Sequence, residues 1–194
     1  MDSKMINIII EALGQTIYMV FFSTLFASVL GFILGIIVTV TSPTGLRPNI
    51  FIYKSLDVII NVLRSFPFII LIVFIIPLTR AIVGTPIGET AAIVPLTIAA
   101  APFVARIIES ALKEVDPGVI EAAKSFGASN LQIIFKVMLK EAVPAIISGL
   151  TLTIINIIGY SAMAGSVGAG GLGKVAISYG YQRYQTDVMI VTVI

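Results

Sequence analysis

Long stretches without a charged residue dominate the chain and predict its main elements. No Asp, Glu, Lys or Arg lies between Glu11 and Arg47, a gap of 35 residues, and a second gap of 32 residues separates Glu141 from Lys174. A helix of about 20 residues crosses the hydrocarbon layer of a bilayer. Each gap is therefore long enough to hold a complete membrane-spanning helix.

The apolar pattern predicts four spans and the beginning of a fifth. The four are expected over residues 15–40, 58–78, 90–108 and 142–165. After Asp187 only seven apolar residues remain, and seven helical residues rise about 10 Å. We interpret them as the start of a fifth span that is truncated in this chain. The sequence thus predicts an all-α, polytopic membrane bundle, with residues 1–194 as a single domain and five spans in the intact protein.

Composition supports a membrane protein and excludes several kinds of site. Apolar residues make up 58% of the chain and charged residues 11%, against about 25% charged residues in a typical soluble domain. The net charge of +2 is too small to indicate a nucleic-acid partner, and Cys and His are both absent. Disulfides, and zinc or haem sites that use those ligands, are therefore excluded. We expect neither a metal nor a cofactor in this chain.

One polar segment, residues 106–141, carries ten charges in 36 residues and must lie in water or against another protein. If it is cytoplasmic, the inner loops hold seven Lys and Arg residues and the outer ones four. Cytoplasmic loops of membrane proteins carry an excess of these residues. We therefore predict an N-terminus outside the cell and a cytoplasmic 106–141 segment.

The polar segment contains local signals for two helices and a sharp corner. Asp116 followed by Pro117 reads as an N-cap with proline at the first helical position. Gly127 is placed to end that helix, because glycine accepts the left-handed conformation common just past a helix. Ser129 and Gln132 have the spacing of a capping box, which predicts a second helix from about Asn130 toward the fourth span.

These residues resemble the EAA loop of permeases from binding-protein-dependent ATP-binding-cassette importers, through Glu121-Ala122-Ala123, three further residues and Gly127. Four other segments are similar to the methionine-importer branch of that family: 64–68 (RSFPF), 101–106 (APFVAR), 160–165 (YSAMAG) and 168–173 (GAGGLG). One departure is that Leu139 precedes Lys140, where the family often has a leucine-proline pair; the proline comes later, at Pro144.

The resemblance implies a function, partners and a location. The chain would be a permease subunit for D- and L-methionine in a prokaryotic inner or plasma membrane, or for another small amino acid or polar solute. Two permeases would form one pathway, two separate ATPase subunits would bind ATP below it, and an external binding (lipo)protein would deliver the substrate. Glu121, Ala122, Ala123 and Gly127 would couple the permease to the ATPase, and the permease itself would do no covalent chemistry.

Other function classes fit the sequence less well. A plain connector needs only a few residues, fewer than two capped helices. A passive channel leaves the folded polar segment unexplained. An intramembrane protease would need histidines or aspartates within the spans; histidine is absent, and Asp57 and Asp187 lie at expected span edges.

Five residues are candidates for the translocation pathway: Arg64, Asn156, Tyr160, Ser161 and Met163. Arg64 is the only charge well inside an expected span, and intramembrane charges are usually functional. It also lies about two turns from the cytoplasmic end of that span, near enough for its long side chain to reach the membrane surface. Alternatively, its guanidinium could donate hydrogen bonds to backbone carbonyls that Pro67 leaves without a helical partner. Met163 could equally fill a core.

Two glycine patterns remain. Residues 168–173 satisfy G-x-G-x-x-G, but a nucleotide site would need a preceding strand. We interpret this segment as flexible or closely packed backbone. Ala27, Gly31 and Gly35 form a small-residue face suited to close helix packing, either within the chain or with a second copy.

Overall fold

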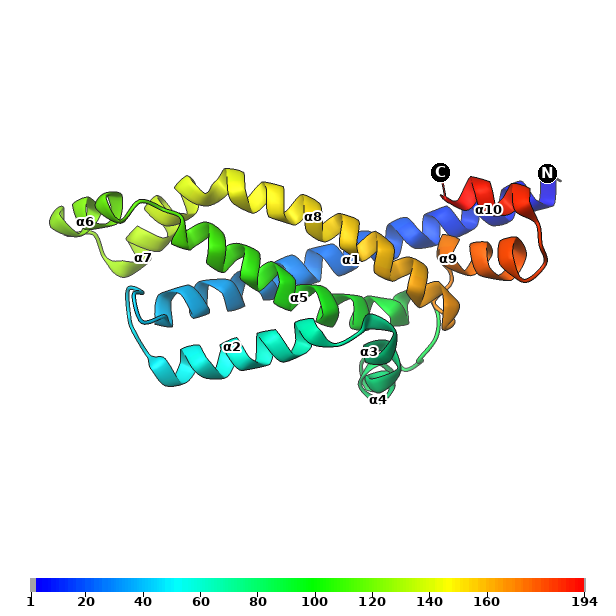
Figure 1. The fold of residues 1–194 in the computed structure, drawn as a ribbon, viewed down its shortest axis with the longest axis horizontal. Coiled ribbons are helices and arrows are strands. Elements are labelled where there is room, and N and C mark those ends of the chain that lie inside the picture. Colours follow the sequence, from blue (N-terminus) through cyan, green and yellow to red (C-terminus); the bar gives the residue numbers. More distant parts are fainter. Residues whose placement is uncertain (1–2, 194) are drawn as a thin grey trace. The chain divides into compact units, whose positions relative to one another are not determined.

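The computed structural model describes residues 3–193, and its regular elements in that range are all helices (Figure 1). In chain order they are α1 (Ser3–Thr41), α2 (Ile50–Ser65), α3 (Phe68–Phe74), α4 (Ile76–Val83), α5 (Glu89–Lys113), α6 (Pro117–Ser125), α7 (Asn130–Gln132), the π-helix η1 (Ile133–Met138), α8 (Leu139–Ser166), α9 (Gly171–Val175), the π-helix η2 (Ala176–Tyr181) and α10 (Thr186–Val193). The predicted all-α class is confirmed.

Within residues 3–193, three helices are long and apolar enough to cross a membrane: α1, α5 and the continuous helix Asn130–Ser166. They contain the first, third and fourth expected spans. Each is longer than expected, and α1 extends from Ser3 rather than from residue 15. The apolar stub after Asp187 is helical in α10, and Ile194 lies outside the described residues. The chain is a multi-pass membrane protein.

The prediction that the second span is a single helix is wrong. Residues 58–78 fall in α2, α3 and α4, with a break at Phe66 and Pro67. The helices α2 and α3 meet at 107° and form either a broken span or a re-entrant loop. Proline has no N–H to continue the helical ladder, and its ring drives the preceding residue out of the helical region. Pro67 therefore ends α2 and becomes the N-cap of α3.

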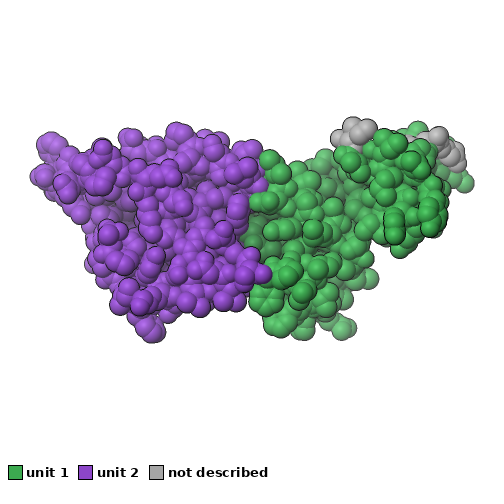
Figure 2. Space-filling model, in the orientation of Figure 1, with its two compact units in different colours: residues 1–27, 66–100, 154–194 green, residues 28–65, 101–153 purple. Residues whose placement is uncertain are grey.

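The chain forms two compact units, coloured separately in Figure 2, where the sequence predicted one domain. Unit 1 consists of residues 1–27, 66–100 and 154–194. One of its cores joins α1, α3, α5 and α8 through Met19, Phe68, Leu96 and Ala164. A second core packs α10 on α1 and α9, centred on Val188.

Unit 2 consists of residues 28–65 and 101–153. Its larger core is built on α5, η1 and the start of α8, and a smaller one joins α1, α2 and α5. Gly35 of α1 lies so close to α5 that an added Cβ would come 2.6 Å from the Cβ of Ile108, and Gly31 makes a similar approach to Ala101 and Val104. The small-residue face of α1 thus has a partner for Gly31 and Gly35 within the chain.

Candidate functional site

The polar segment begins with the helix that its sequence predicts. The Asp116 carboxylate accepts a hydrogen bond from the backbone N–H of Gly118 at 2.6 Å, and Pro117 occupies the first position of α6. An N-cap of this kind satisfies one of the N–H groups that a helix start leaves free. The predicted N-terminus of α6 is confirmed.

Gly127 forms the predicted corner. Its φ is +77°, and its N–H donates to Lys124 O at 2.9 Å while the N–H of Ala128 donates to Ala123 O at 3.1 Å. This pair of bonds is a Schellman motif, which requires a left-handed residue just past the helix. An added Cβ would meet nothing within 4 Å. The backbone conformation, and not lack of space, therefore calls for glycine.

The second half of the segment joins the corner to a membrane helix. Ser129 Oγ accepts from the N–H of Gln132 at 3.3 Å, and Gln132 Oε1 accepts from the N–H of Ser129 at 2.8 Å. Both halves of the predicted capping box are present. The helix then continues without a break through η1 into α8.

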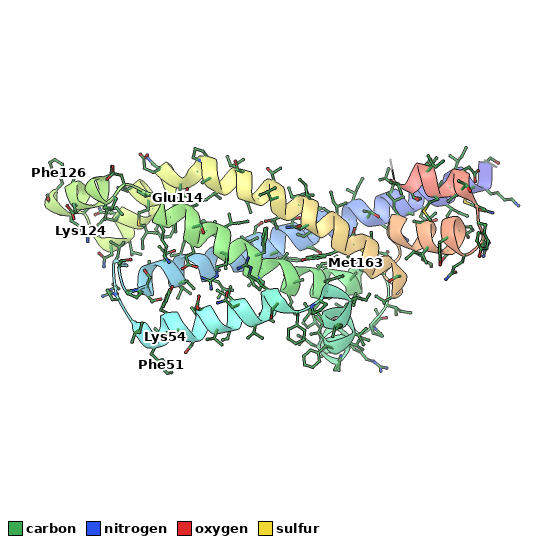
Figure 3. All side chains as sticks on the ribbon, in the orientation of Figure 1. Phe51, Lys54, Glu114, Lys124, Phe126 and Met163 are labelled. Carbon is green, nitrogen blue, oxygen red and sulfur yellow. The ribbon has the colours of Figure 1, made fainter. Side chains whose placement is uncertain are left out.

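The two faces of α6 differ. Ile120 and Ala123 pack against the core of unit 2, whereas Glu121 and Ala122 are exposed. Just past the helix, Phe126 is 91% exposed and points away from the rest of unit 2 (Figure 3). The small size of Ala123 thus has a cause within this chain, while Ala122 and Phe126 are open to a partner.

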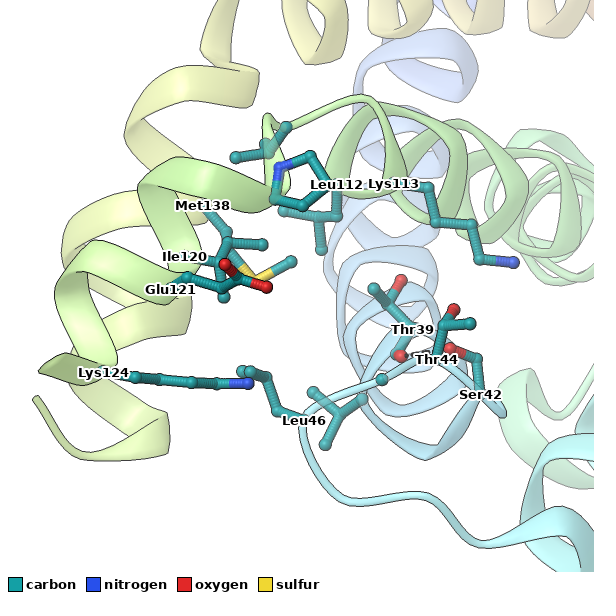
Figure 4. A pocket seen from close by; sticks show the side chains of 14 residues that line it. Thr39, Ser42, Thr44, Leu46, Leu112, Lys113, Ile120, Glu121, Lys124 and Met138 are labelled. Atoms are coloured by element: carbon teal, nitrogen blue, oxygen red, sulfur yellow. Dashed lines mark hydrogen bonds between the residues drawn. The ribbon is translucent and has the colours of Figure 1, made fainter.

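A cavity of 290 Å³, lined by both polar and apolar side chains, lies between α6 and the loop that follows α1 (Figure 4). Glu121 and Lys124 face it from α6, Lys113 from the end of α5, and Thr39 and Thr44 from the other side. In the part of the chain that the structure describes, no group of three acidic side chains is placed to hold a metal ion.

Charged side chains connect α2 to α5 within unit 2. Arg106 donates to Asp57, to Asn61 Oδ1 at 2.9 Å and to Glu109 Oε2 at 2.5 Å. Glu109, whose side chain is 5% exposed, also accepts from Lys113 at 2.7 Å. Each charge in this network has an opposite charge beside it, which is what a low-dielectric setting requires.

Arg64 differs from Arg106. Its guanidinium lies over the ring of Phe103, 6.0 Å from the centroid, and its side chain is exposed. Because α2 begins at Ile50, Arg64 is about 21 Å along the helix from that end. The distance of Arg64 from the membrane surface, and with it snorkelling, stays a prediction.

An open groove of 430 Å³ runs past Arg64 in unit 2. Arg64 contributes from α2; Phe103, Ser110 and Glu114 contribute from α5; and Ser148 contributes from α8. The floor is narrow because α5 and α8 approach closely at Gly149, where an added Cβ would be 3.1 Å from Ile107 Cδ1.

Three of the remaining pathway candidates lie on one face of α8. Asn156, Tyr160 and Met163 follow one another at spacings of four and three residues, and Asn156 and Met163 are exposed. Tyr160, between them, stacks on Phe68 in the core of unit 1, with ring centroids 4.7 Å apart. Ser161 is 2% exposed, and its hydroxyl donates to Ile158 O. The structure therefore does not bring the four together.

The glycine-rich segment 168–173 leads from α8 into α9, and the structure has no strand before it within residues 3–193. It is closely packed: an added Cβ on Gly165 would lie 2.5 Å from Lys174 N, and one on Gly170 would lie 2.7 Å from Gln15 Oε1. Close packing, one of the two alternatives expected for this segment, describes it.

A family model described as "Binding-protein-dependent transport system inner membrane component" matches residues 31–194. The chain belongs to this family.

Relatives of this family member are similar over most of their length. A Vibrio cholerae protein named "Probable D-methionine transport system permease protein MetI" is 52% identical over 188 residues, which cover 97% of this chain and 84% of the relative. The Escherichia coli K12 D-methionine transport system permease protein MetI is 46% identical over 165 residues, covering 85% and 76%. An inward-facing structure of the MetNI methionine ABC transporter matches with a TM-score of 0.97 and 46% identity, covering 100% of this chain and 89% of that one.

Sequence reasoning missed the Asp57–Arg106–Glu109 network. The charge pattern places Arg106 in the polar segment and Asp57 at a span edge, although both lie within helices. A signal was present: Arg106, Glu109 and Lys113 are spaced three and four residues apart, which places them on one face of α5. The partner helix could not be identified, because nothing local relates position 57 to position 106.

Proposed function

We propose that this chain is the permease subunit of an ATP-binding-cassette importer for D- and L-methionine. The observation that carries the proposal is its similarity along nearly the whole chain to D-methionine transport permeases, at 52% identity to the Vibrio cholerae protein. The coupling segment, with its capped helix and glycine corner, adds independent physical support. It gives this permease a rigid attachment for a separate motor subunit.

The proposed complex holds two copies of this chain, two ATPase subunits that bind the ATP, an external binding (lipo)protein and the surrounding lipid. The ATPase contacts α6 on its exposed side. There, Glu121 offers a carboxylate, Ala122 allows close approach, and Phe126 offers an exposed aromatic ring. Exposed aromatic residues commonly anchor protein interfaces.

Coupling follows from the construction of the segment. Closure of the ATPase dimer on ATP displaces α6, and the Gly127 corner passes that displacement to α7, η1 and α8. The cavity beneath α6 leaves room for such a shift. The pathway then switches between inward and outward access because the ATPase binds the two states differently. This permease supplies the moving walls, and ATP hydrolysis takes place in the partner.

In unit 1, the proposed contacts to the solute are Asn156 and Met163 on α8. In unit 2, the proposed contact is Arg64 in the groove. Tyr160 and Ser161 hold the orientation of α8 in unit 1, through the stack on Phe68 and the bond to Ile158 O.

The proposed location is a prokaryotic inner or plasma membrane, with the N-terminus outside and residues 106–141 in the cytoplasm. The seven-to-four distribution of Lys and Arg supports this orientation. Ser125 is exposed at the end of α6, and the chain has no native cysteine. A Ser125→Cys variant should resist a membrane-impermeant maleimide in intact cells and react once the cells are opened. Efficient labelling in intact cells would reverse the topology.

Reconstitution tests the function itself. Proteoliposomes holding the permease, its ATPase and the binding protein should accumulate radiolabelled methionine only with ATP, and substrate-loaded binding protein should stimulate hydrolysis. Uptake without ATP would indicate a passive channel. Preferential uptake of a different small amino acid or polar solute would agree with an importer but contradict methionine as its substrate. Peptide cleavage without transport would favour a protease.

A further inference from the structure

Arg64 is a cation in a membrane helix for which the structure provides no anionic partner among residues 3–193. There its guanidinium lies against the ring of Phe103. Arg106, in the same unit, binds Asp57 and Glu109. An aromatic ring attracts a guanidinium but leaves its N–H donors free. The guanidinium N–H groups of Arg64 are thus available to a hydrogen-bond acceptor outside these residues.

The position of Arg64 adds a second, independent indication of a ligand. It lies in the last turn of α2, directly before the break at Phe66 and Pro67. In membrane transporters, discontinuous helices characteristically form substrate sites near the middle of the bilayer. An unpaired charge there is costly, and it is normally retained because it faces a water-filled route and acts on the solute.

The groove beside Arg64 fits a zwitterionic amino acid. Its volume of 430 Å³ falls within the range of about 300–1,000 Å³ that is typical of small-molecule sites. The guanidinium of Arg64 is a planar fork, which suits the two oxygens of a carboxylate. The hydroxyls of Ser110 and Ser148 can accept hydrogen bonds from an ammonium group.

We propose that Arg64, held against Phe103, binds the α-carboxylate of the transported amino acid in the groove of unit 2. This inference rests on the proposed importer function and adds a substrate contact within the permease itself. The permease thereby distinguishes amino acids from apolar solutes of the same size, in addition to any selection by the external binding protein.

The test uses the assembled permease–ATPase complex in phosphatidylcholine nanodiscs, without the binding protein. Radiolabelled L-methionine is titrated and then competed with unlabelled L-methionine or with L-methioninol, which keeps the side chain and amine but lacks the carboxylate. The wild type should bind methionine at least about tenfold more tightly than methioninol, as expected for a hydrogen-bonded charge.

Substitution at Arg64 should remove that difference selectively. Arg64→Gln should weaken methionine binding by at least about tenfold and leave methioninol binding unchanged, and Arg64→Lys should retain part of the preference. The matched control is Lys54→Gln, which removes an exposed cation from the same helix (Figure 3); it should change neither affinity. If Arg64 had only a structural role, Arg64→Gln would weaken the binding of both ligands equally, and that result would overturn the proposal.

Two further outcomes would also overturn it. Equal binding of methionine and methioninol by the wild type, or no methionine binding at all, would mean that no carboxylate site exists. Loss of methionine binding in phosphatidylglycerol nanodiscs would assign the guanidinium to an anionic lipid headgroup. Wild-type uptake in the complete proteoliposomes separates the two levels: its absence contradicts the proposed importer, whereas uptake with no carboxylate preference contradicts this inference alone.

Discussion

The side-chain carbonyl of Gln15 accepts a hydrogen bond from the backbone N–H of Gly171 at 2.8 Å, across 156 positions of the chain. The next residue repeats the arrangement, because Thr16 Oγ1 accepts from the N–H of Leu172 at 2.9 Å. The first N–H groups of a helix have no partner within it. Two side chains of α1 therefore cap α9 in unit 1.

We expect Gln15→Ala to lower the stability of the protein by about 1–3 kcal/mol, because the half-buried N–H of Gly171 loses its acceptor. Thermal unfolding of the purified protein in detergent measures this as a lower apparent Tm. The control is Gln182→Ala, since the Gln182 side chain is exposed. Equal unfolding temperatures for the two variants would show that the bond contributes nothing.

The Gln15–Gly171 contact shows the limit of sequence reasoning. The spacing of glycines in 168–173 allowed close packing to be considered, but it did not identify the surface against which the backbone packs. That surface is the first third of α1, and no periodic pattern connects the two. The polar segment behaved differently: the caps at Asp116 and Ser129 and the corner at Gly127 are local, so their residues suffice to predict them.

The close approach at Gly35 predicts a second stability effect. Gly35→Ala would place a methyl group 2.6 Å from Ile108 Cβ and 2.8 Å from Ala105 O. Overpacking of this kind costs about 1–3 kcal/mol. Gly14→Ala is the matched control in the same helix, because an added Cβ there meets nothing within 4 Å and alanine favours a helix by about 1 kcal/mol. A Gly35→Ala protein as stable as Gly14→Ala would contradict the packing.

The Arg106 network predicts a measurable coupling between α2 and α5. Asp57→Asn and Arg106→Gln should each destabilise the protein, since each leaves a charge without one of its partners. The double variant should lose less stability than the sum of the losses in the two single variants, with a coupling free energy of about 0.5–3 kcal/mol. Pairing Asp57→Asn with Lys136→Gln, which removes an exposed cation from η1, provides the control, for which additivity is expected. Additivity in the Arg106 cycle as well would reduce the network to a surface contact.

The broken second span shows why a visible signal can still be misread. Pro67 is plain in the sequence, but Pro95 and Pro102 lie inside α5 and Pro144 inside α8 without breaking them. Proline within a membrane helix is tolerated when neighbouring groups satisfy the freed carbonyls. Tertiary surroundings therefore decide between a kink and a break, and the sequence near Pro67 does not contain them.

Gly127 supports the last prediction, which concerns coupling between the ATPase and the pathway. Gly127→Val should uncouple ATP hydrolysis from uptake, because a β-branched residue at φ +77° costs at least about 1 kcal/mol. The strain opens the Schellman motif and turns α6 relative to α7. Gly127→Asn is the control, since asparagine tolerates the left-handed region and space around the position is free. Methionine transported per ATP hydrolysed should fall in the valine variant and stay near wild type in the asparagine variant.

Assembly must be measured alongside coupling. Gly127→Val should still insert in the membrane and co-purify with the ATPase, because the exposed side of α6 is unchanged. Ala122→Trp should instead reduce co-purification, since it places a large side chain on that exposed side. Normal uptake and normal assembly in both Gly127→Val and Ala122→Trp would mean that residues 106–141 only connect two membrane helices. The rigid corner at Gly127 would then have no part in transport, and the proposed route from α6 to α8 would be wrong.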